Sequence, residues 1–370
     1  MKARDSIMTF AFTGGGTGGH IYPGLAVASC LQKKIPCRII WIGSAKGMDR
    51  SIVEAAGLEF YGIASGKLRR RFSLRNVTDL FRVIAGFFAA RKILKKERPK
   101  LLFSKGGFVS VPPSAAAASL KIPVYGHESD LTPGLATRIN FRFSEKLFIP
   151  YKDSVTFYAQ AVRNKLDVSG NPVRPLFQNA DGAKGRVFLG IEESETMLLV
   201  LGGSSGSLEI NNLIAECLID LVKEFIVVHQ CGSGDKNLPA GNARYKPYEY
   251  INDELPHVIA AADLVICRGG AGTLWECAAL KKPMIIIPLR GTGTRGDQVE
   301  NARIFHEAGA AINFINDINE EISAKKLAAM AAALAADKEK LKAMASSQIC
   351  TAGAADYIAE AIMQKVRGDG

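Results

Sequence analysis

Short apolar runs alternate with amphipathic segments along the first half of the chain. Uninterrupted apolar residues predict strands over 8–13, 37–42, 100–104 and 122–126. Apolar residues at helical spacing predict helices over 22–34, 48–56 and 112–120, and a further helix within the basic segment 67–98. Strands that alternate with helices in this way form a parallel sheet with helices on both faces.

The second half of the chain repeats this alternation. Strands are predicted over 197–201, 225–229, 264–267 and 284–287, and helices over 210–223, 272–280, 325–342 and 352–366. Turn-forming residues at 168–175 separate the halves. We therefore expect an α/β protein with two domains, 1–168 and 169–345, and a C-terminal segment, 346–370, whose helix packs back on the first domain.

Glycine-rich turns follow corresponding strands in the two halves. Ser104–Gly107 follows the strand at 100–104, and Cys267–Gly270 follows the strand at 264–267. Each turn continues into an Ala-rich stretch, a Lys-x-Pro and another apolar run. This similarity predicts two Rossmann-like domains that face each other and hold a ligand in the cleft between them.

A third glycine turn, Gly14–Gly19, has the G-x-G-x-x-G spacing of dinucleotide-binding sites. Such sites need an acidic residue about 20 positions further on to bind the ribose, and no acidic residue occurs between Asp5 and Asp49. This argues against a nicotinamide cofactor. The glycines still allow a diphosphate to approach the backbone, and the helix that begins near Pro23 directs its N-terminal amides toward that anion.

Three side chains next to these turns could carry chemistry. His20 could accept a proton from a hydroxyl, or it could only cap the helix and position the loop, and Glu128 has an equivalent place after the strand at 122–126. Glu276 could accept hydrogen bonds from both ribose hydroxyls while its helix N-terminus faces a phosphate; it could instead be a dipole partner in the first turn. An Asp-x-Asp pair near a strand end, which would indicate a metal, is absent from the sequence.

Charge is divided unevenly along the chain, whose formal net charge is +11. Residues 1–170 contain 27 Lys and Arg against 11 Asp and Glu, whereas residues 171–370 contain 20 against 25. Aromatic and aliphatic residues alternate with the basic ones within 67–105, which fits attraction to an anionic lipid surface; the alternative is a solvated basic face on a core helix. Nucleic acid is not an expected partner, because neither stacking aromatics on a sheet nor a docking motif is found.

Seven motifs, in unbroken order, resemble those of the bacterial MurG glycosyltransferase family; they lie at 14–26, 105–112, 127–134, 170–174, 202–206, 268–276 and 295–302. The resemblance implies a GT-B type fold and an inverting transfer of GlcNAc from UDP-GlcNAc to undecaprenyl-diphospho-MurNAc-pentapeptide, with no cofactor. It also implies a peripheral location on the cytoplasmic face of the cell membrane.

The resemblance also assigns roles to individual residues. His20 would be the catalytic base or would position it, with Glu128 as the second candidate. The donor-binding set would comprise Thr17, Gly18, Gly19, Arg174, Ser204, Ile251, Gly270, Ala271, Gly272, Thr273, Glu276 and Gln298. Within it, Thr17, Gly18 and Gly19 would also lie near the acceptor diphosphate, Ile251 would contact uracil through its backbone, and Gln298 would contact the sugar. The acceptor or membrane set would comprise Lys67, Arg69, Arg70, Lys105 and Asp130.

Three positions depart from the commoner family pattern, in which Asn stands at Asp130, Tyr at Phe108 and Gln at Asp297. A diphosphate would repel Asp130 unless this carboxylate faces a hydroxyl or Lys105. Three other functions stay open: transfer to another lipid such as diacylglycerol, epimerisation of UDP-GlcNAc, and non-catalytic binding of a nucleotide sugar at a membrane.

Overall fold

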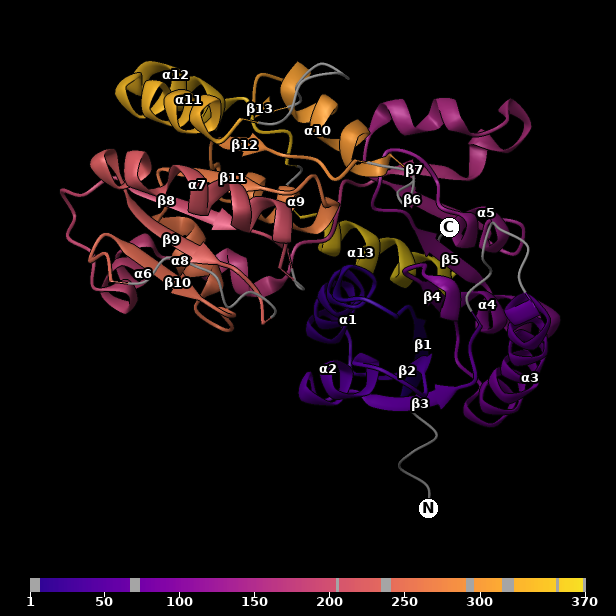
Figure 1. Cartoon of the computed structure of the whole chain (residues 1–370). Coiled ribbons are helices and arrows are strands. Elements are labelled where there is room, and N and C mark those ends of the chain that lie inside the picture. The colour runs from indigo at the N-terminus through magenta and orange to yellow at the C-terminus, as the bar shows by residue number, and fades with distance from the viewer. Residues whose placement is uncertain are drawn as a thin grey trace. The chain divides into compact units, whose positions relative to one another are not determined.

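The computed structural model describes residues 7–66, 74–203, 206–233, 241–290, 296–314, 323–350 and 353–368. The chain forms two compact units, residues 1–174 with 351–370 and residues 175–350. The sequence pattern places the corresponding boundaries after 168 and 345. Each unit has one parallel sheet flanked by helices (Figure 1), which confirms the predicted α/β fold class.

The first unit is built on a seven-stranded sheet with the strand order β3-β2-β1-β4-β5-β6-β7. Its strands are β1 (Met8–Thr13), β2 (Cys37–Ser44), β3 (Glu59–Ile63), β4 (Leu102–Ser104), β5 (Val124–His127), β6 (Lys146–Ile149) and β7 (Leu166–Val168). In the register of β1 and β2, Phe10 lies opposite Ile39 and Phe12 opposite Trp41. The direction of chain progression reverses between β1 and β4, so the loops after these two strands diverge there.

Among the described residues of this unit, the α-helices around the sheet are α1 (Tyr22–Lys34), α2 (Asp49–Ala55), α3 (Leu74–Glu97), α4 (Val111–Ser119), α5 (Leu135–Asn140) and α13 (Ala354–Arg367). Residues of α13 join the same buried cluster as those of β1 and α1, and the two helices lie side by side (Figure 1). The C-terminal segment is therefore part of the core of the first unit.

The second unit has a six-stranded sheet with the order β10-β9-β8-β11-β12-β13, and its direction reverses between β8 and β11. The strands are β8 (Met197–Leu201), β9 (Ile226–Gln230), β10 (Tyr245–Tyr248), β11 (Leu264–Cys267), β12 (Met284–Ile286) and β13 (Ala311–Asn313). The helices are α6 (Gly182–Leu189), α7 (Leu208–Glu224), α8 (Leu255–Ala261), α9 (Ala271–Ala279), α10 (Asp297–Glu307), α11 (Ala324–Ala336) and α12 (Lys338–Ser346). Strands β8, β9 and β11 are completely buried, which explains the uninterrupted apolar sequences of β8 and β11 and the apolar start of β9.

One predicted helix is two helices in the structure. The sequence predicts a single helix over 325–342, but α11 ends and α12 begins at Asp337. The Asp337 carboxylate accepts a hydrogen bond from the Lys340 N–H at 2.9 Å and so caps the N-terminus of α12. An aspartate favours this cap over continuing the helix, because its side chain competes for backbone N–H groups.

Candidate functional site

In the first unit, two of the glycine turns begin side by side where the strand order reverses. The Lys105 N–H donates to the Thr13 carbonyl at 2.8 Å, so the ends of β4 and β1 are joined at the point where the turns depart. In open α/β sheets, ligands bind in the crevice outside the carboxyl ends of the strands at this kind of reversal. The topology therefore places both turns where a ligand is expected.

Asp49, the first residue of α2, fixes the Gly14–Gly19 turn. Its carboxylate is fully buried and accepts hydrogen bonds from the N–H groups of Gly16 and Ser44, both at 2.9 Å. A Cβ at Gly15 would lie 1.9 Å from Asp49 Oδ2, so a larger residue cannot occupy that position. Asp49 is not part of any of the sequence motifs. A signal was present, because Asp49 is the first acidic residue after the turn, but it binds the turn itself and not a ribose.

His20 ends the short helix η1 (Gly18–His20), and its imidazole is half-buried. A Cβ at Gly107 would lie 3.1 Å from His20 Cδ2, and one at Gly106 would lie 3.8 Å from His20 Nδ1. The glycines of the second turn thus leave room for the imidazole, and the structure brings His20 together with the 105–112 motif. Thr17 and Gly19 are exposed beside it, and Gly18 is buried. A half-buried imidazole at this place can exchange a proton with a bound hydroxyl.

Glu128 follows β5 and holds the turn that comes after it. Its Oε1 accepts from the N–H groups of Ser129 and Asp130 at 2.8 and 3.2 Å, and its Oε2 accepts from the Gly134 N–H at 3.0 Å. Burial acts to raise the pKa of this carboxyl, but Lys105 and the hydrogen bonds outweigh burial and lower the pKa below its ordinary 4.5. A carboxylate with occupied oxygens and a lowered pKa is a weak proton acceptor, so its geometry favours anchoring the turn over acting as a base.

Lys105 is buried next to this carboxylate, with 1% of its surface exposed. Its Nζ donates to Ser129 Oγ at 2.8 Å, and Glu128 and Asp130 lie close enough to stabilise its charge. Burial outweighs that attraction and lowers the pKa of Lys105 below 10.5. Burial, together with the Lys105 charge, also lowers the pKa of His127 well below 6.5, and His127 Nε2 donates to the Gly170 carbonyl at 3.1 Å.

In the second unit, the N-terminus of α9 opens where the strand order reverses between β8 and β11. Gly270 is the N-cap, and it makes no side-chain cap hydrogen bond. Gly272 is exposed, whereas Thr273 and Glu276 are half-buried. The first amides of a helix have no partner within the helix and carry a partial positive charge, so this end of α9 can receive an anion. Glu276 lies within one further turn, where its carboxylate can meet groups attached to that anion.

Arg268, which precedes this helix end, serves the protein interior. Its guanidinium forms an ion pair with Glu209 at 2.7 Å and donates to Ser207 Oγ, the N-cap of α7, and to the Ile287 carbonyl. Because its donors are directed at α7 and the end of β12, Arg268 ties the 268–276 motif to the sheet.

Gln298, in the first turn of α10, lies against the same motif. A Cβ at Gly269 would lie 2.3 Å from the Gln298 carbonyl oxygen, so only glycine allows α10 to approach this closely. Asn301 Nδ2 donates to the Gly269 carbonyl at 3.1 Å, and Gln298 Oε1 accepts from the Leu289 N–H at 2.9 Å. The structure therefore brings together two motifs that are separated in the sequence, 268–276 and 295–302.

Ile251 is buried near the glycine turn that follows β8. Its N–H donates to Gln230 Oε1 at 3.0 Å, and Gln230 Nε2 lies 3.5 Å from the Gly203 carbonyl. Gln230, which is not part of any of the sequence motifs, thus connects Ile251 to Gly203, just after β8. It ends a strand that begins with three apolar residues, Ile226–Val228, and a polar residue at the carboxyl end of such a strand is the signal that could have found it.

The remaining predicted site residues are Arg174, Ser204, Lys67, Arg69 and Arg70. Arg174 belongs to the first unit, and its guanidinium lies 4.9 Å from the centre of the Tyr22 ring. The predicted residues Ser204, Lys67, Arg69 and Arg70 lie outside the described residues. Within the described ranges, no group of three or more His, Cys, Asp or Glu side chains is arranged to hold a metal ion.

Comparison with known proteins identifies relatives along nearly the whole chain. Residues 10–149 match the N-terminal domain of glycosyltransferase family 28, and residues 197–361 match its C-terminal domain. A UDP-N-acetylglucosamine–N-acetylmuramyl-(pentapeptide) pyrophosphoryl-undecaprenol N-acetylglucosamine transferase of Treponema denticola is 45% identical over 364 residues, which covers 92% of this chain and 93% of the relative. A transferase of the same name from Shouchella clausii is 44% identical over 302 residues, with coverage of 81% and 84%.

Solved structures share the fold at lower sequence identity. MurG of Acinetobacter baumannii matches with a TM-score of 0.70 at 21% identity, covering 97% of this chain and 99% of that one. A UDP-GlcNAc 2-epimerase of Neisseria meningitidis, bound to UDP-GlcNAc, matches with a TM-score of 0.68 at 16% identity and coverage of 97% and 100%. The family resemblance that the seven motifs indicate is confirmed by the sequence relatives: this chain belongs to glycosyltransferase family 28.

Proposed function

We propose that this protein transfers GlcNAc from UDP-GlcNAc to undecaprenyl-diphospho-MurNAc-pentapeptide, a step of peptidoglycan synthesis. The observation that carries the proposal is its 45% identity, over 92% of the chain, with a transferase named for this reaction. The likeness to an epimerase is one of fold alone, at 16% identity, so it does not favour epimerisation. The seven motifs and the sequence relatives both support the transferase.

The donor is recognised in the second unit. The amides at the N-terminus of α9, next to Gly270–Thr273, receive the diphosphate, and Glu276 binds the ribose hydroxyls. Ile251, whose backbone is fixed by Gln230, contacts the uracil, and Gln298 contacts the sugar. Support comes from the convergence of these residues around the strand-order reversal of the second sheet. As UDP leaves, the helix end stabilises the charge that develops on its diphosphate.

The acceptor is recognised in the first unit, where the Gly14–Gly19 turn receives its diphosphate. In the reaction, the muramoyl 4-hydroxyl oxygen bonds to the anomeric carbon while the bond from that carbon to UDP breaks, so the configuration inverts. The hydroxyl proton passes to the His20 imidazole, which is half-buried beside both glycine turns. Anchoring of the turn by Asp49 supports this geometry, because a fixed loop holds the acceptor without reorganisation.

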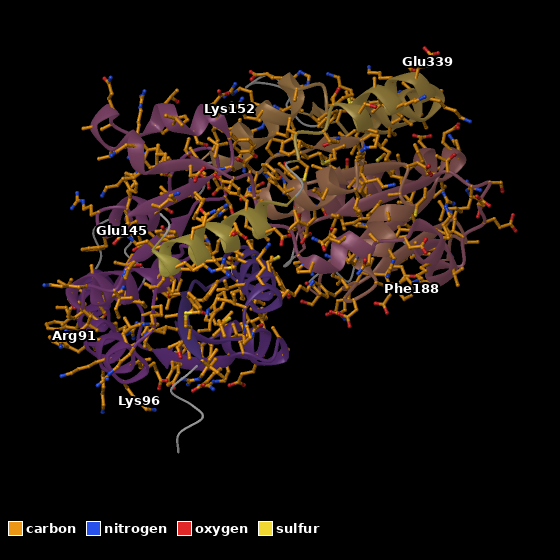
Figure 2. The ribbon with its side chains drawn as sticks, turned by 180° about the vertical axis from the view of Figure 1, so that it is seen from behind. Arg91, Lys96, Glu145, Lys152, Phe188 and Glu339 are labelled. Carbon is orange, nitrogen blue, oxygen red and sulfur yellow. The ribbon has the colours of Figure 1, made fainter. Side chains whose placement is uncertain are left out.

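We further propose that α3 binds the cytoplasmic face of the membrane peripherally. Four large apolar side chains of this helix are between 45% and 68% exposed: Leu80, Phe81, Ile84 and Phe88. Exposed basic residues follow toward its C-terminal end, among them Arg91 and Lys96, which lie at the outer edge of the helix in Figure 2. No helix among the described segments is long and apolar enough to cross a membrane. An apolar face beside basic residues suits the surface of an anionic bilayer.

Acceptor-dependent release of UDP tests the proposed function. UDP-GlcNAc is incubated with the protein, with and without a short-chain polyprenyl-diphospho-MurNAc-pentapeptide, and both UDP and the GlcNAc-bearing product are measured. We expect UDP release only with this acceptor. Release without an acceptor, or with diacylglycerol in its place, would contradict the proposal, as would the formation of an epimerised UDP-sugar.

A further inference from the structure

The side chain of Lys105 connects two motifs of the first unit, 105–112 and 127–134. It directly follows β4, and its stem passes the first glycine turn, since a Cβ at Gly14 would lie 3.0 Å from Lys105 Cβ and one at Gly24 would lie 3.7 Å away. The far end of the side chain reaches the turn after β5, where Nζ donates to Ser129 Oγ at 2.8 Å. A buried lysine is rare unless its charge is paired, so this ammonium requires an explanation.

The turn that Lys105 reaches is held by its own network. The Glu128 carboxylate accepts from three backbone N–H groups, those of Ser129, Asp130 and Gly134. Asn171 Nδ2 donates to the Ser129 carbonyl at 2.9 Å. The position of this turn therefore depends on these charged and polar groups, and the buried ones, among them Glu128 and Lys105, must be satisfied.

Lys105 offsets one of the two negative charges in this region. Glu128 and Asp130 each carry one negative charge, and the His127 imidazole is held neutral by burial. With Lys105 the formal sum is one negative charge; without it, two carboxylates repel each other next to the proposed diphosphate site. An uncharged residue at 105 with Asn at 130, the residue more common in the family, would give the same single charge.

We propose that Lys105 is a positioning residue for acceptor recognition: it donates to Ser129, offsets the charges of Glu128 and Asp130, and so holds the 128–134 turn beside the glycine turns. The inference rests on the proposed function. Lys105 acts through the turn and through Gly106 and Gly107, which line the His20 imidazole. A shift of this turn misaligns the bound acceptor. The donor residues lie in the second unit and are not affected by it.

A double-mutant cycle tests this pairing. The kcat/KM for the polyprenyl-diphospho-muramoyl acceptor and the KM for UDP-GlcNAc are measured for the wild type, Lys105→Met, Asp130→Asn and the double variant. We expect Lys105→Met to lower the acceptor kcat/KM by on the order of 10- to 100-fold when Asp130 is present. In the Asp130→Asn background the same change costs less than about threefold. Neither change alters the KM for UDP-GlcNAc.

Lys100→Met, at an exposed lysine just before β4, is the matched control and leaves the kinetic constants unchanged. If Lys105→Met lowers the acceptor kcat/KM equally in both backgrounds, or not at all, the proposed pairing is wrong. A Lys105→Met protein that does not fold leaves the comparison of Asp130→Asn with the double variant, which must agree within about threefold.

A wild type without acceptor-dependent turnover would overturn the proposed function but not the pairing. The same four proteins are then compared by urea unfolding. A pairing of Lys105 with Asp130 requires a larger loss of stability from Lys105→Met with Asp130 than with Asn at this position. Equal losses would contradict it.

Discussion

At the scale of single residues, a substitution at His20 tests catalysis separately from donor binding. We expect His20→Ala to lower kcat by about 10²- to 10⁴-fold, because it removes the group that accepts the hydroxyl proton. The KM for UDP-GlcNAc stays unchanged, since the N-terminus of α9, Glu276 and Gln298, which bind the donor in the proposed reaction, belong to the second unit. Steady-state rates with both substrates varied provide the measurement. His306→Ala, at an exposed histidine of α10, is the control, and full activity of the His20 variant would exclude the imidazole from the chemistry.

Glu128 makes the stability of the first unit sensitive to acid. Its pKa in the folded protein lies below its ordinary 4.5, so between these two values the unfolded chain binds more protons than the folded one. This stabilisation is complete above pH 4.5 and is lost as the pH falls through the lowered pKa. Urea unfolding of the wild type and Glu128→Gln at several pH values measures the effect, and we expect the difference between them to shrink in acid. Glu216→Gln, at an exposed site, keeps the wild-type pH dependence.

Residues that lie just beyond the ends of strands could be found from the sequence, and residues that support them could not. Glu128 directly follows β5, and His20 and Glu276 lie at the glycine turns after β1 and β11, whose positions the apolar runs reveal. Asp49 and the partner of Lys105 act over separations of 33 and 24 residues, through contacts that no local pattern encodes. Only the folded sheet, which joins the ends of distant strands, brings such pairs together.

At the scale of elements, the N-terminus of α9 and Glu276 form one donor-binding unit. We expect Glu276→Ala to raise the KM for UDP-GlcNAc by about tenfold or more, because a carboxylate that accepts hydrogen bonds from hydroxyls is lost. Calorimetric titration with UDP measures the same loss without the acceptor. Glu307→Ala, at the exposed end of α10, serves as the matched control. An unchanged affinity for UDP would contradict the assignment to the ribose.

Binding to vesicles that contain anionic lipid tests the role proposed for the exposed apolar and basic residues of α3. We expect binding that weakens with salt, because each basic residue near the surface contributes about 1 kcal/mol of electrostatic attraction. Phe81 and Phe88 are 68% and 64% exposed, and Phe81→Ser with Phe88→Ser weakens binding by about tenfold or more.

The control for the vesicle experiment is Ile219→Ser, because Ile219 is 77% exposed on α7 of the second unit. It leaves co-sedimentation with vesicles unchanged. Equal binding to neutral vesicles, or binding that does not respond to salt, would contradict the role proposed for α3.

Strands and helices with a strong apolar pattern can be predicted from the sequence, whereas short or polar elements cannot. The central strands of both sheets are largely buried, so most of their residues are apolar. Edge strands β3 and β10 and the three-residue β7 contain polar residues or proline and carry no such signal. The break between α11 and α12 was missed because alanine and lysine favour a helix on either side of Asp337.

At the scale of the whole molecule, the chain leaves the first unit at Arg174 and returns to it at the end. Ile358 and Ile362 of α13 are completely buried in the cluster that contains β1 and α1. Tyr357 donates to Asp167 Oδ1 at 2.8 Å, and Lys365 pairs with Glu145 at 2.8 Å. The first unit therefore takes part of its core from a segment that is synthesised after the second unit.

Removal of α13 tests whether the core of the first unit needs this helix for its stability. Each buried isoleucine contributes about 1.5–3 kcal/mol, so a chain that ends at Cys350 loses a large part of the 5–15 kcal/mol that stabilises a typical domain. We expect hydrogen exchange to show that β1, β2 and β4 lose protection while β8, β9 and β11 keep theirs, because the second core contains no residue of α13. Deletion of residues 369–370 alone is the control and leaves both sheets protected. If the first sheet stays protected without α13, its core is complete before the chain returns, and α13 covers the unit without stabilising it.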